Sequence, residues 1–354
     1  MGDNGEGKTN ILEGISYLCL TKSFYAASDD VVLKIEEQYF ITLGDFLAEN
    51  GVEYKVRVEF DKNQSQKSVT VNKVRIDKAS SLIGQFPVVI LSPEQSAITF
   101  GSPLDRRKFV DFVISQSSKK YLENLINYRK ILRQRNKILS EMQSTRRENY
   151  SAIESWNESL IRVGAAIMTK RIEFINDFQG MMVASYAQLA GTTEQPGITY
   201  APSFECEKID IDEILTVFTK EIENRFSDER RIGYSLIGPH RDEFIFCINN
   251  LNAKSYASQG QHKTFLVALK LAEFFYLKER CNETPILLLD DVLSELDGYR
   301  SQRLLEVTAN YGQIFITSTD ARTLNWKPVA SANPRKFYIR QGKVDSGEDA
   351  VCVH

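Results

Sequence analysis

The first residues whose types and spacing could do chemistry form a glycine-rich segment, GDNGEGKTN, at the start of the chain. It fits the pattern GxxxxGK followed by Ser or Thr, in which glycines permit positive φ angles and let backbone N–H groups approach a phosphate closely. In that pattern Lys8 reaches the β- and γ-phosphates of a nucleotide, and Thr9 ligates Mg²⁺. A flexible glycine turn before a helix is the alternative, because so short a match also arises by chance. The expected phosphate-binding residues are Gly2, Asp3, Asn4, Gly5, Glu6, Gly7, Lys8, Thr9 and Asn10.

A second candidate group stands at the end of an apolar segment, PILLLDD at Pro285–Asp291. A carboxylate at the carboxyl end of a buried strand lies beside a phosphate loop and can organise a magnesium ion. We assign the metal side to Asp290, and to Asp291 the orientation or deprotonation of the attacking water. Aspartate is one methylene shorter than glutamate, so we expect slow turnover. A strand that ends in a solvated acidic turn is the alternative.

A third candidate is the segment SQGQ, which precedes a helical pattern and contains Ser258, Gln259, Gly260 and Gln261. Small residues and free N–H groups at a helix start can bind an anion. Ser258 is equally a good helix N-cap, and the two interpretations are about evenly matched on these four residues alone. The order along the chain favours the anion site: phosphate loop, SQGQ, then an acidic-ended strand.

The elements that must position these groups follow from hydrophobic periodicity. A helix is predicted from Thr9 to about Lys22, directly after the phosphate loop. Residues 54–60 and 69–71 alternate apolar and polar side chains, as antiparallel strands with one solvated face do, and Pro87–Leu91 has the composition of a buried strand. The phosphate-loop motif needs a buried strand before it, and only Met1 precedes Gly2. We therefore expect the natural protein to begin earlier.

The middle of the chain is predicted to be helical and the last third to alternate. Helices are expected from Pro103 to about Leu189 with a junction near 143–149, then a break at Pro196–Pro202 and a helix over Asp210–Phe226. The other expected elements are short strands near Tyr234–Ile237, Glu243–Ile248 and Lys254–Tyr256, a helix at Gln261–Arg280, a strand at Ile286–Leu289, a helix at Tyr299–Asn310 and a strand at Gln313–Thr317. The final alternation of helices and strands indicates a parallel α/β architecture.

Composition excludes several classes of protein. The 354 residues are 42% hydrophobic and 26% charged, which is typical of a globular protein, and no apolar run is long enough to span a membrane. The five cysteines are scattered without CxxC spacing, so we expect neither a disulfide framework nor a zinc site. We expect a cytoplasmic protein without a membrane partner. Because the formal net charge is −3, any contact with nucleic acid needs a local basic patch.

The order of these motifs resembles the ABC-type ATPase head, a P-loop NTPase fold of class α/β. The resemblance implies ATP and Mg²⁺ as cofactors and Lys8 and Asp291 as catalytic residues. It also implies that Ser258 binds the γ-phosphate held by an opposite subunit, and that Leu293–Asp297 is a D-loop at the dimer interface, which adds Asp297 to the cofactor-binding residues. The expected organisation is an N-terminal part of the ATPase lobe with an antiparallel β subdomain (1–102), an inserted helical lobe (103–232) and a C-terminal part of the ATPase lobe (233–354).

Within ABC-type heads, the details resemble the RecF family over nearly the whole chain. The resemblance depends on the phosphate loop and on LSPEQ, GSPLDRRKFVD, GPHRDEF, SQGQHK and LLLDDVLSELD. It implies a weak DNA-stimulated ATPase of recombinational repair, whose ATP-bound homodimer grips DNA near gaps or single-/double-strand junctions. It further implies that slow hydrolysis releases the DNA, and that RecO- and RecR-type partners help to place RecA. Two alternatives are an ATP-gated nuclease-associated ATPase, for which we see no room in the chain, and an ATP-binding scaffold without significant turnover.

Two further features have an open interpretation. His240 and Arg241 stand in a Gly-Pro turn, where a structural, interface or inter-lobe role is a better interpretation than catalysis. Basic residues gather in the helical region, but a solvated helix face is the default interpretation for any one of them. DNA binding is therefore implied by the resemblance more than by charge. The basic residues are Arg106, Arg107, Lys108, Lys119, Lys120, Arg129, Lys130, Arg133, Arg135, Lys137, Arg146 and Arg147.

Overall fold

The computed structural model describes residues 1–145, 150–191, 193–206, 210–319 and 334–345. Contacts divide them into two units, each of which gathers segments that are distant in the sequence. Unit 1 consists of residues 1–100, 181–195 and 257–354, and unit 2 of residues 101–180 and 196–256. Residues 233–256, which we placed with the C-terminal part, therefore lie with the helices of unit 2, because β7 pairs with β6 there.

A parallel sheet forms the centre of unit 1. It contains β5 (Val88–Leu91), β9 (Ile286–Leu289) and β10 (Ile314–Ile316) in the order β10-β9-β5. All four side chains of β5 are buried, as are the last three of β9, which is why both strands consist of continuous Val, Ile and Leu. The carboxyl ends of the three strands meet at one edge, so residues that follow them in the sequence become neighbours.

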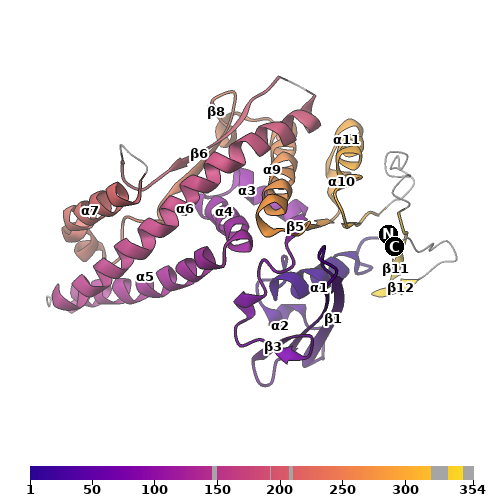
Figure 1. Cartoon of the computed structure of the whole chain (residues 1–354), viewed down its shortest axis with the longest axis horizontal. Coiled ribbons are helices and arrows are strands. Elements are labelled where there is room, and N and C mark those ends of the chain that lie inside the picture. Colours follow the sequence, from indigo (N-terminus) through magenta and orange to yellow (C-terminus); the bar gives the residue numbers. More distant parts are fainter. Residues whose placement is uncertain (146–149, 192, 207–209, 320–333, 346–354) are drawn as a thin grey trace. The chain divides into compact units, whose positions relative to one another are not determined.

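An antiparallel sheet lies beside helix α1 (Lys8–Leu20) in unit 1, at the indigo end of the colour scale in Figure 1. Its strands are β1 (Tyr39–Leu47), β2 (Glu53–Asp61), β3 (Gln66–Val71) and β4 (Val74–Arg75), in that order. Burial alternates along β1 and β2, and the inner face contributes Val56 and Val58 to the core. The period-2 pattern in the sequence therefore predicted this sheet correctly.

The remaining elements of unit 1 connect and cover these sheets. They are α2 (Asp29–Val32), the 3₁₀ turns η1 (Ala79–Ser81) and η2 (Pro93–Ser96), α3 (Ala97–Phe100), α9 (Gln259–Cys281), α10 (Val292–Glu295), α11 (Gly298–Thr308) and the hairpin of β11 (Tyr338–Arg340) with β12 (Lys343–Asp345). Helix α9 is the most deeply buried of them, with fourteen of its side chains inside the unit. Its apolar residues surround most of its circumference, as expected of a core helix.

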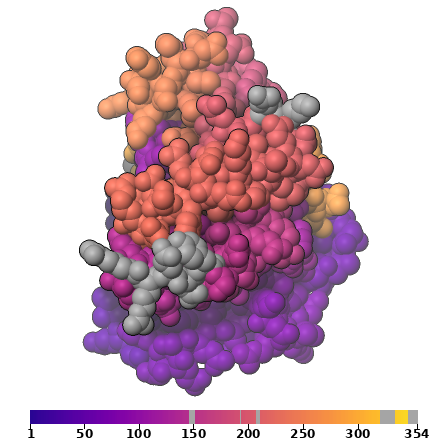
Figure 2. Space-filling view, turned by 90° about the vertical axis from the view of Figure 1, so that its left-hand side faces the viewer, coloured from indigo at the N-terminus to yellow at the C-terminus, as the bar shows by residue number. Residues whose placement is uncertain are grey.

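Unit 2 is built on long helices. They are α4 (Pro103–Ser117), α5 (Lys119–Thr145), α6 (Tyr150–Ala190) and α7 (Ile211–Ile232), and the unit also holds α8 (Ala253–Tyr256) and a small sheet of β6 (Pro196–Ala201), β7 (Glu243–Ile248) and β8 (Leu251–Asn252). Figure 2 shows α7, in coral, lying across the magenta helices, in agreement with its contact with α5. From Met181 onward, the last turns of α6 belong to unit 1.

Local sequence explains where the helices begin and end. Ser102 and Asp105 form a reciprocal capping box before α4, with Pro103 in the first turn. Asp210 caps α7 by accepting a hydrogen bond from the N–H of Glu213 at 2.9 Å, and Gly233 ends that helix at φ 88°. The junction expected near 143–149 falls mainly on residues outside those described.

Three short expectations were wrong. Of the break expected at Pro196–Pro202, residues Pro196–Ala201 form strand β6 instead, because Pro196 stands at the first position of an edge strand, where its missing N–H costs little. Residues 254–256 belong to a helical turn, and 234–237 form no strand. In the first case, pairing with β7, which is distant in the sequence, decided the structure of a segment that has little preference of its own.

Candidate functional site

The phosphate loop folds around the side chain of its own lysine. Gly7 is the residue before α1 and has φ 98°, and Gly5 has φ 84°, values that favour glycine at both positions. Lys8 is buried, and its Nζ donates hydrogen bonds to the carbonyl oxygens of Gly2 at 2.8 Å and Asp3 at 2.9 Å. The backbone of the loop thus curves around the ammonium group of Lys8. The first N–H groups of α1 have no acceptor within the helix, as at any helix N-terminus.

The residue after this lysine meets the acidic end of β9. The Thr9 hydroxyl lies 2.9 Å and 3.1 Å from the two carboxylate oxygens of Asp290. Asp290 is buried, and its Oδ1 also accepts a hydrogen bond of 2.7 Å from the Thr317 hydroxyl. The structure therefore brings together Thr9 and Asp290, the two residues predicted to form a metal site.

Asp291, the second acidic residue, adopts an unusual conformation. Its φ is 50°, in the left-handed region that few non-glycine residues adopt, and its N–H donates to the Thr317 hydroxyl at 2.9 Å. Its Oδ1 is buried without a hydrogen-bond donor in the described part of the chain, and the same holds for Oε1 of Gln95 in η2. Gln95 follows β5 and Asp291 follows β9, and these strands are neighbours in the sheet. Two buried acceptor atoms without a donor, at the same sheet edge as a strained backbone, indicate a site for a donor-bearing ligand.

The SQGQ segment forms the N-terminus of α9. Ser258 Oγ accepts a hydrogen bond from the N–H of Gln261 at 3.2 Å, and Gln261 Oε1 accepts one from the N–H of Ser258 at 2.7 Å. This is a capping box, so the N-cap interpretation of the sequence holds. It does not exclude an anion, because the Ser258 side chain is used as an acceptor and keeps its own hydrogen to donate. Ser258, Gln259 and the N-terminus they form are at the surface.

The LSELD segment joins α10 to α11. Asp297 caps α11 through a 2.9 Å hydrogen bond from the N–H of Arg300, and this bond lowers the pKa of the Asp297 carboxyl. Lys263 of α9 donates to the backbone carbonyl of Glu295 at 2.6 Å and to its carboxylate at 2.9 Å. Lys263, which is exposed, therefore links LSELD to α9, the helix that begins with SQGQ.

The other predicted loop residues are placed differently. Asp3, Asn4, Gly5 and Asn10 are exposed. The side chain of Glu6 instead accepts a hydrogen bond from the N–H of Gln341 in the β11–β12 hairpin, and its carbonyl accepts from Gly342 at 2.9 Å. Glu6 thus supports the loop from outside.

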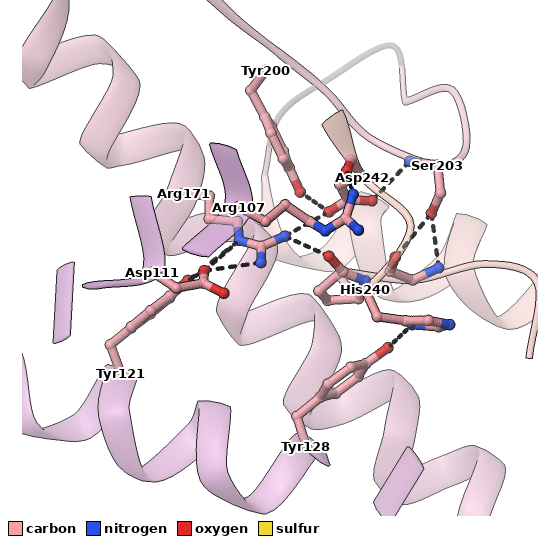
Figure 3. Close-up of polar contacts among 11 residues, drawn as sticks. Arg107, Asp111, Tyr121, Tyr128, Arg171, Tyr200, Ser203, His240 and Asp242 are labelled. Carbon is pink, nitrogen blue, oxygen red and sulfur yellow. Dashed lines mark hydrogen bonds and ion pairs between the residues drawn. The ribbon is translucent and has the colours of Figure 1, made fainter. Parts of the chain in front are cut away.

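A separate polar cluster lies inside unit 2, as Figure 3 shows. The buried guanidinium of Arg171 pairs with Asp111 at 2.9 Å and with Asp242 at 3.1 Å. The Tyr121 hydroxyl donates to Asp111 at 2.5 Å, and the Tyr200 hydroxyl donates to Asp242. Every charge in the cluster is paired and hydrogen-bonded, which is the condition under which buried charges are tolerated. The DRRKFVD and GPHRDEF motifs thus meet in a structural core.

His240 belongs to the same cluster. Its Nδ1 lies 2.8 Å from the Tyr128 hydroxyl, and its Nε2 lies 3.3 Å from the carbonyl of Ser235. A carbonyl can only accept, so Nε2 carries the hydrogen and Nδ1 accepts from Tyr128. Burial, with the nearby arginines, lowers the pKa of His240 to about 4. Both nitrogens are engaged within unit 2, as a structural role requires.

Several basic residues of the helical region are also structural. Arg106 pairs with Glu243, and Arg107 donates to the carbonyl of Asp242. Arg135 is completely buried and pairs with Glu229 at 2.6 Å. The exposed cations that remain on α5 are Lys119, Lys120, Arg129, Lys130, Arg133 and Lys137.

One site residue carried too little signal in the sequence. Thr317 holds both aspartates, but a threonine at the end of a short strand is common. Gln95 stands in LSPEQ, one of the segments on which the family resemblance depends, and the structure places it after β5, the neighbour of β9 in the sheet. Among the described residues, no group of three or more His, Cys, Asp or Glu side chains could hold a metal ion. No described helix combines the length and the apolar character that crossing a bilayer requires.

Comparisons with known proteins agree with this geometry. The chain is 42% identical to the DNA replication and repair protein RecF of Chloroherpeton thalassium over 327 residues, which covers 91% of this chain and 88% of the relative. It is 35% identical to the protein of that name from Salinibacter ruber, over 99% of this chain and 85% of the relative. No family model matches the chain.

Solved structures show the same fold. The structure of the recombination mediator protein RecF-ATPrS in the RecFOR pathway superposes with a TM-score of 0.88 at 30% identity, covering 97% of this chain and 90% of the other. The structure of RecF-ATP in that pathway gives 0.87 at 29% identity, covering 97% and 89%.

Proposed function

Because the chain belongs to the RecF family of DNA replication and repair proteins, with the fold of an ABC-type ATPase head, we propose that it is an ATP-driven DNA clamp. In this proposal ATP binds the phosphate loop, two copies close around two nucleotides, and the closed dimer holds DNA at gaps or single-/double-strand junctions. Slow hydrolysis then opens it. The observation that carries the proposal is the contact between Thr9 and Asp290.

The site residues fit a magnesium-bound triphosphate. Thr9 and Asp290 offer a hydroxyl and a carboxylate, oxygen ligands of the kind that Mg²⁺ prefers. Both residues would hold the ion, directly or through water, and when bound the ion would neutralise charge on the β- and γ-phosphates. The scarcity of carboxylates is consistent with this, because Mg²⁺ in such sites keeps waters and takes further ligands from the phosphates.

Lys8 supplies the positive charge of the loop. In the structure it is bound to two carbonyl oxygens of the loop, at Gly2 and Asp3. Phosphate oxygens are stronger acceptors for an ammonium than carbonyls are, so Lys8 exchanges these bonds for the β- and γ-phosphates when ATP enters.

Asp291 is proposed to handle the water. Its buried Oδ1 is a free acceptor in the described part of the chain, and Gln95 Oε1 is a second one. A water held by both would be oriented for attack on the γ-phosphate, and Asp291 would take its proton. Because an aspartate side chain is one methylene shorter than that of glutamate, we expect slow ATP hydrolysis. A slow rate would set how long the dimer stays closed.

Ser258 is proposed to complete the site of the other copy. Its hydroxyl hydrogen is available, and it stands at an exposed helix N-terminus, where the backbone also favours an anion. Asp297 and the rest of LSELD, linked to α9 by Lys263, would lie at the same dimer interface.

The α5 helix offers the DNA contact. Its exposed face carries a row of cations at four-residue intervals, Arg129, Arg133 and Lys137. The helical rise of about 1.5 Å per residue spaces them about 6 Å apart along the helix axis. Such a row suits successive backbone phosphates and gives non-specific, salt-dependent binding. RecO- and RecR-type proteins are the proposed partners, since the related solved structures belong to the RecFOR pathway.

Analytical ultracentrifugation with and without ATP tests the proposal. We expect a monomer without ATP, a dimer with ATP and Mg²⁺, and tighter association on gapped duplex DNA. Lys8→Ala should abolish nucleotide binding, whereas Ser258→Arg should retain it and abolish the dimer. A dimer that forms equally well in both variants would overturn the clamp, and a dimer without measurable turnover would favour the scaffold alternative.

A further inference from the structure

Glu194 lies next to the serine segment although it is distant from it in the sequence. It follows α6, and its Oε1 accepts a hydrogen bond of 2.7 Å from the side-chain amide of Gln261. Its Oε2 accepts one of 2.6 Å from the hydroxyl of Tyr186, a completely buried residue of the last turns of α6. All of these residues belong to unit 1.

The chemistry of the two partners sets the orientation of the Gln261 amide. A carboxylate accepts hydrogen bonds and donates none, so the NH₂ group of Gln261 must face Glu194. Its oxygen must then face the N–H of Ser258, which is the 2.7 Å bond of the capping box. Without Glu194, the amide could turn over and present two hydrogens to a backbone N–H, which would break the box.

Tyr186 holds Glu194 in place. Burial and the hydrogen bond to Glu194 raise the pKa of Tyr186, so its hydroxyl remains a donor at any ordinary pH. The side chains thus form a directed series: Tyr186 donates to Glu194, Gln261 donates to Glu194, and Gln261 accepts from Ser258.

We infer that Glu194 is a positioning residue, which fixes the amide of Gln261 and through it the geometry of Ser258 at the start of α9. The inference rests on the proposed function, in which Ser258 binds the γ-phosphate held by a second copy. Glu194 itself touches no phosphate. Its effect falls on dimer closure and leaves the binding of ATP to the phosphate loop of the same copy unchanged.

Two substitutions and their combination test the series. Gln261→Glu places two carboxylates opposite each other, although Glu is itself a standard residue for this position of a capping box. Combined with Glu194→Gln, it restores one carboxylate and one amide in exchanged positions, so every hydrogen bond of the series can form again. Glu194→Gln alone places a second amide, at position 194, opposite the amide of Gln261. Because an amide can both donate and accept, neither side chain then fixes the orientation of the other.

Three measurements separate positioning from folding. They are the dissociation constant of the ATP-bound dimer by analytical ultracentrifugation, the affinity of the isolated copy for a fluorescent ATP analogue, and the hydrogen exchange of the peptide that contains Ser258. We expect Gln261→Glu to weaken the dimer on the order of tenfold or more and to speed exchange at Ser258. The double variant should return both to within about twofold of the parent, and nucleotide affinity should stay constant throughout.

The outcomes distinguish this inference from the function on which it rests. If the parent chain does not dimerise with ATP, the clamp proposal fails and the positioning role fails with it. If the parent dimerises but Gln261→Glu is equally harmful with and without Glu194→Gln, only the positioning role is overturned. Unfolding of the single variant, checked by circular dichroism, with a normal double variant would still support the pairing.

Discussion

Thr9 and Asp290, which lie 281 positions apart in the chain, are in hydrogen-bond contact at 2.9 Å. The contact joins the first helix of unit 1 to the carboxyl end of β9, and thereby makes one site from the two ends of the sequence. Asp290 accepts hydrogen bonds from the hydroxyls of Thr9 and Thr317. If the Thr9 hydroxyl turned toward a metal ion, the bond from Thr317 would still hold the Asp290 carboxylate in place.

We predict that Asp290→Asn makes ATP binding nearly independent of Mg²⁺. The amide keeps the shape and can still bond to Thr9, but it lacks the charge that holds the ion. The affinity gained by adding Mg²⁺ should fall on the order of 10- to 100-fold. Titration with a fluorescent ATP analogue, in Mg²⁺ and in EDTA, measures this. An unchanged Mg²⁺ effect would mean that Asp290 does not hold the ion, and Asp212→Asn, at an exposed carboxylate on α7, is the control.

Asp291→Asn should separate hydrolysis from closure. Without a base the single-turnover rate should drop on the order of 10²- to 10⁴-fold, while ATP-dependent dimerisation persists or lasts longer. Rapid-quench measurement of radiolabelled phosphate gives the rate. A variant that hydrolyses as fast as the parent would remove this role from Asp291.

The α5 row makes a prediction about salt. Replacement of Arg129, Arg133 and Lys137 by Glu should weaken binding to gapped duplex and lower the slope of log affinity against log salt by about 0.9 for each DNA phosphate that the helix no longer neutralises. Fluorescence anisotropy between low and physiological salt measures the slope. The matched control replaces Lys220, Arg225 and Arg231 by Glu, which changes the charge equally on the exposed face of α7. Equal weakening in both variants would show a general field effect instead of direct binding by α5.

Removal of one buried charge should destabilise unit 2. Arg171→Met leaves Asp111 and Asp242 buried without their shared partner, which should cost about 3 to 5 kcal/mol of unfolding free energy. Urea unfolding monitored by circular dichroism measures it. Arg225→Met, at an exposed pair of 4.0 Å, should change stability by less than about 0.5 kcal/mol.

His240 predicts a pH dependence. Its pKa is about 4 in the folded protein, whereas it is about 6.5 in the unfolded chain, so the unfolded state binds more protons between these values. The contribution of His240 to stability is therefore complete above pH 6.5 and declines as the pH falls toward 4, by about 3 kcal/mol in full. His240→Gln should remove that part of the slope, which urea midpoints at pH 4.5 and 7 can measure. A variant with the slope of the parent would contradict the assignment.

The sequence predicted the fold well where its own periodicity decides the structure. Continuous apolar runs marked β5 and β9, and the alternation over 54–60 marked the antiparallel sheet. It predicted poorly where pairing with a distant segment decides: Pro196 starts a strand only because β7 is available to it. The same limit applies to the site. Phosphate-binding and acidic residues have recognisable spacing, whereas Glu194 and Thr317 act through hydrogen bonds to individual residues, which leave no spacing pattern in the sequence.

One hydroxyl serves both aspartates: Thr317 donates to Asp290 and accepts from the N–H of Asp291. The consequence is that Asp290 and Asp291 respond together to a change at position 317. Thr317→Val would remove one hydrogen bond from each aspartate in a single step, whereas Thr317→Ser keeps the hydroxyl and allows both bonds.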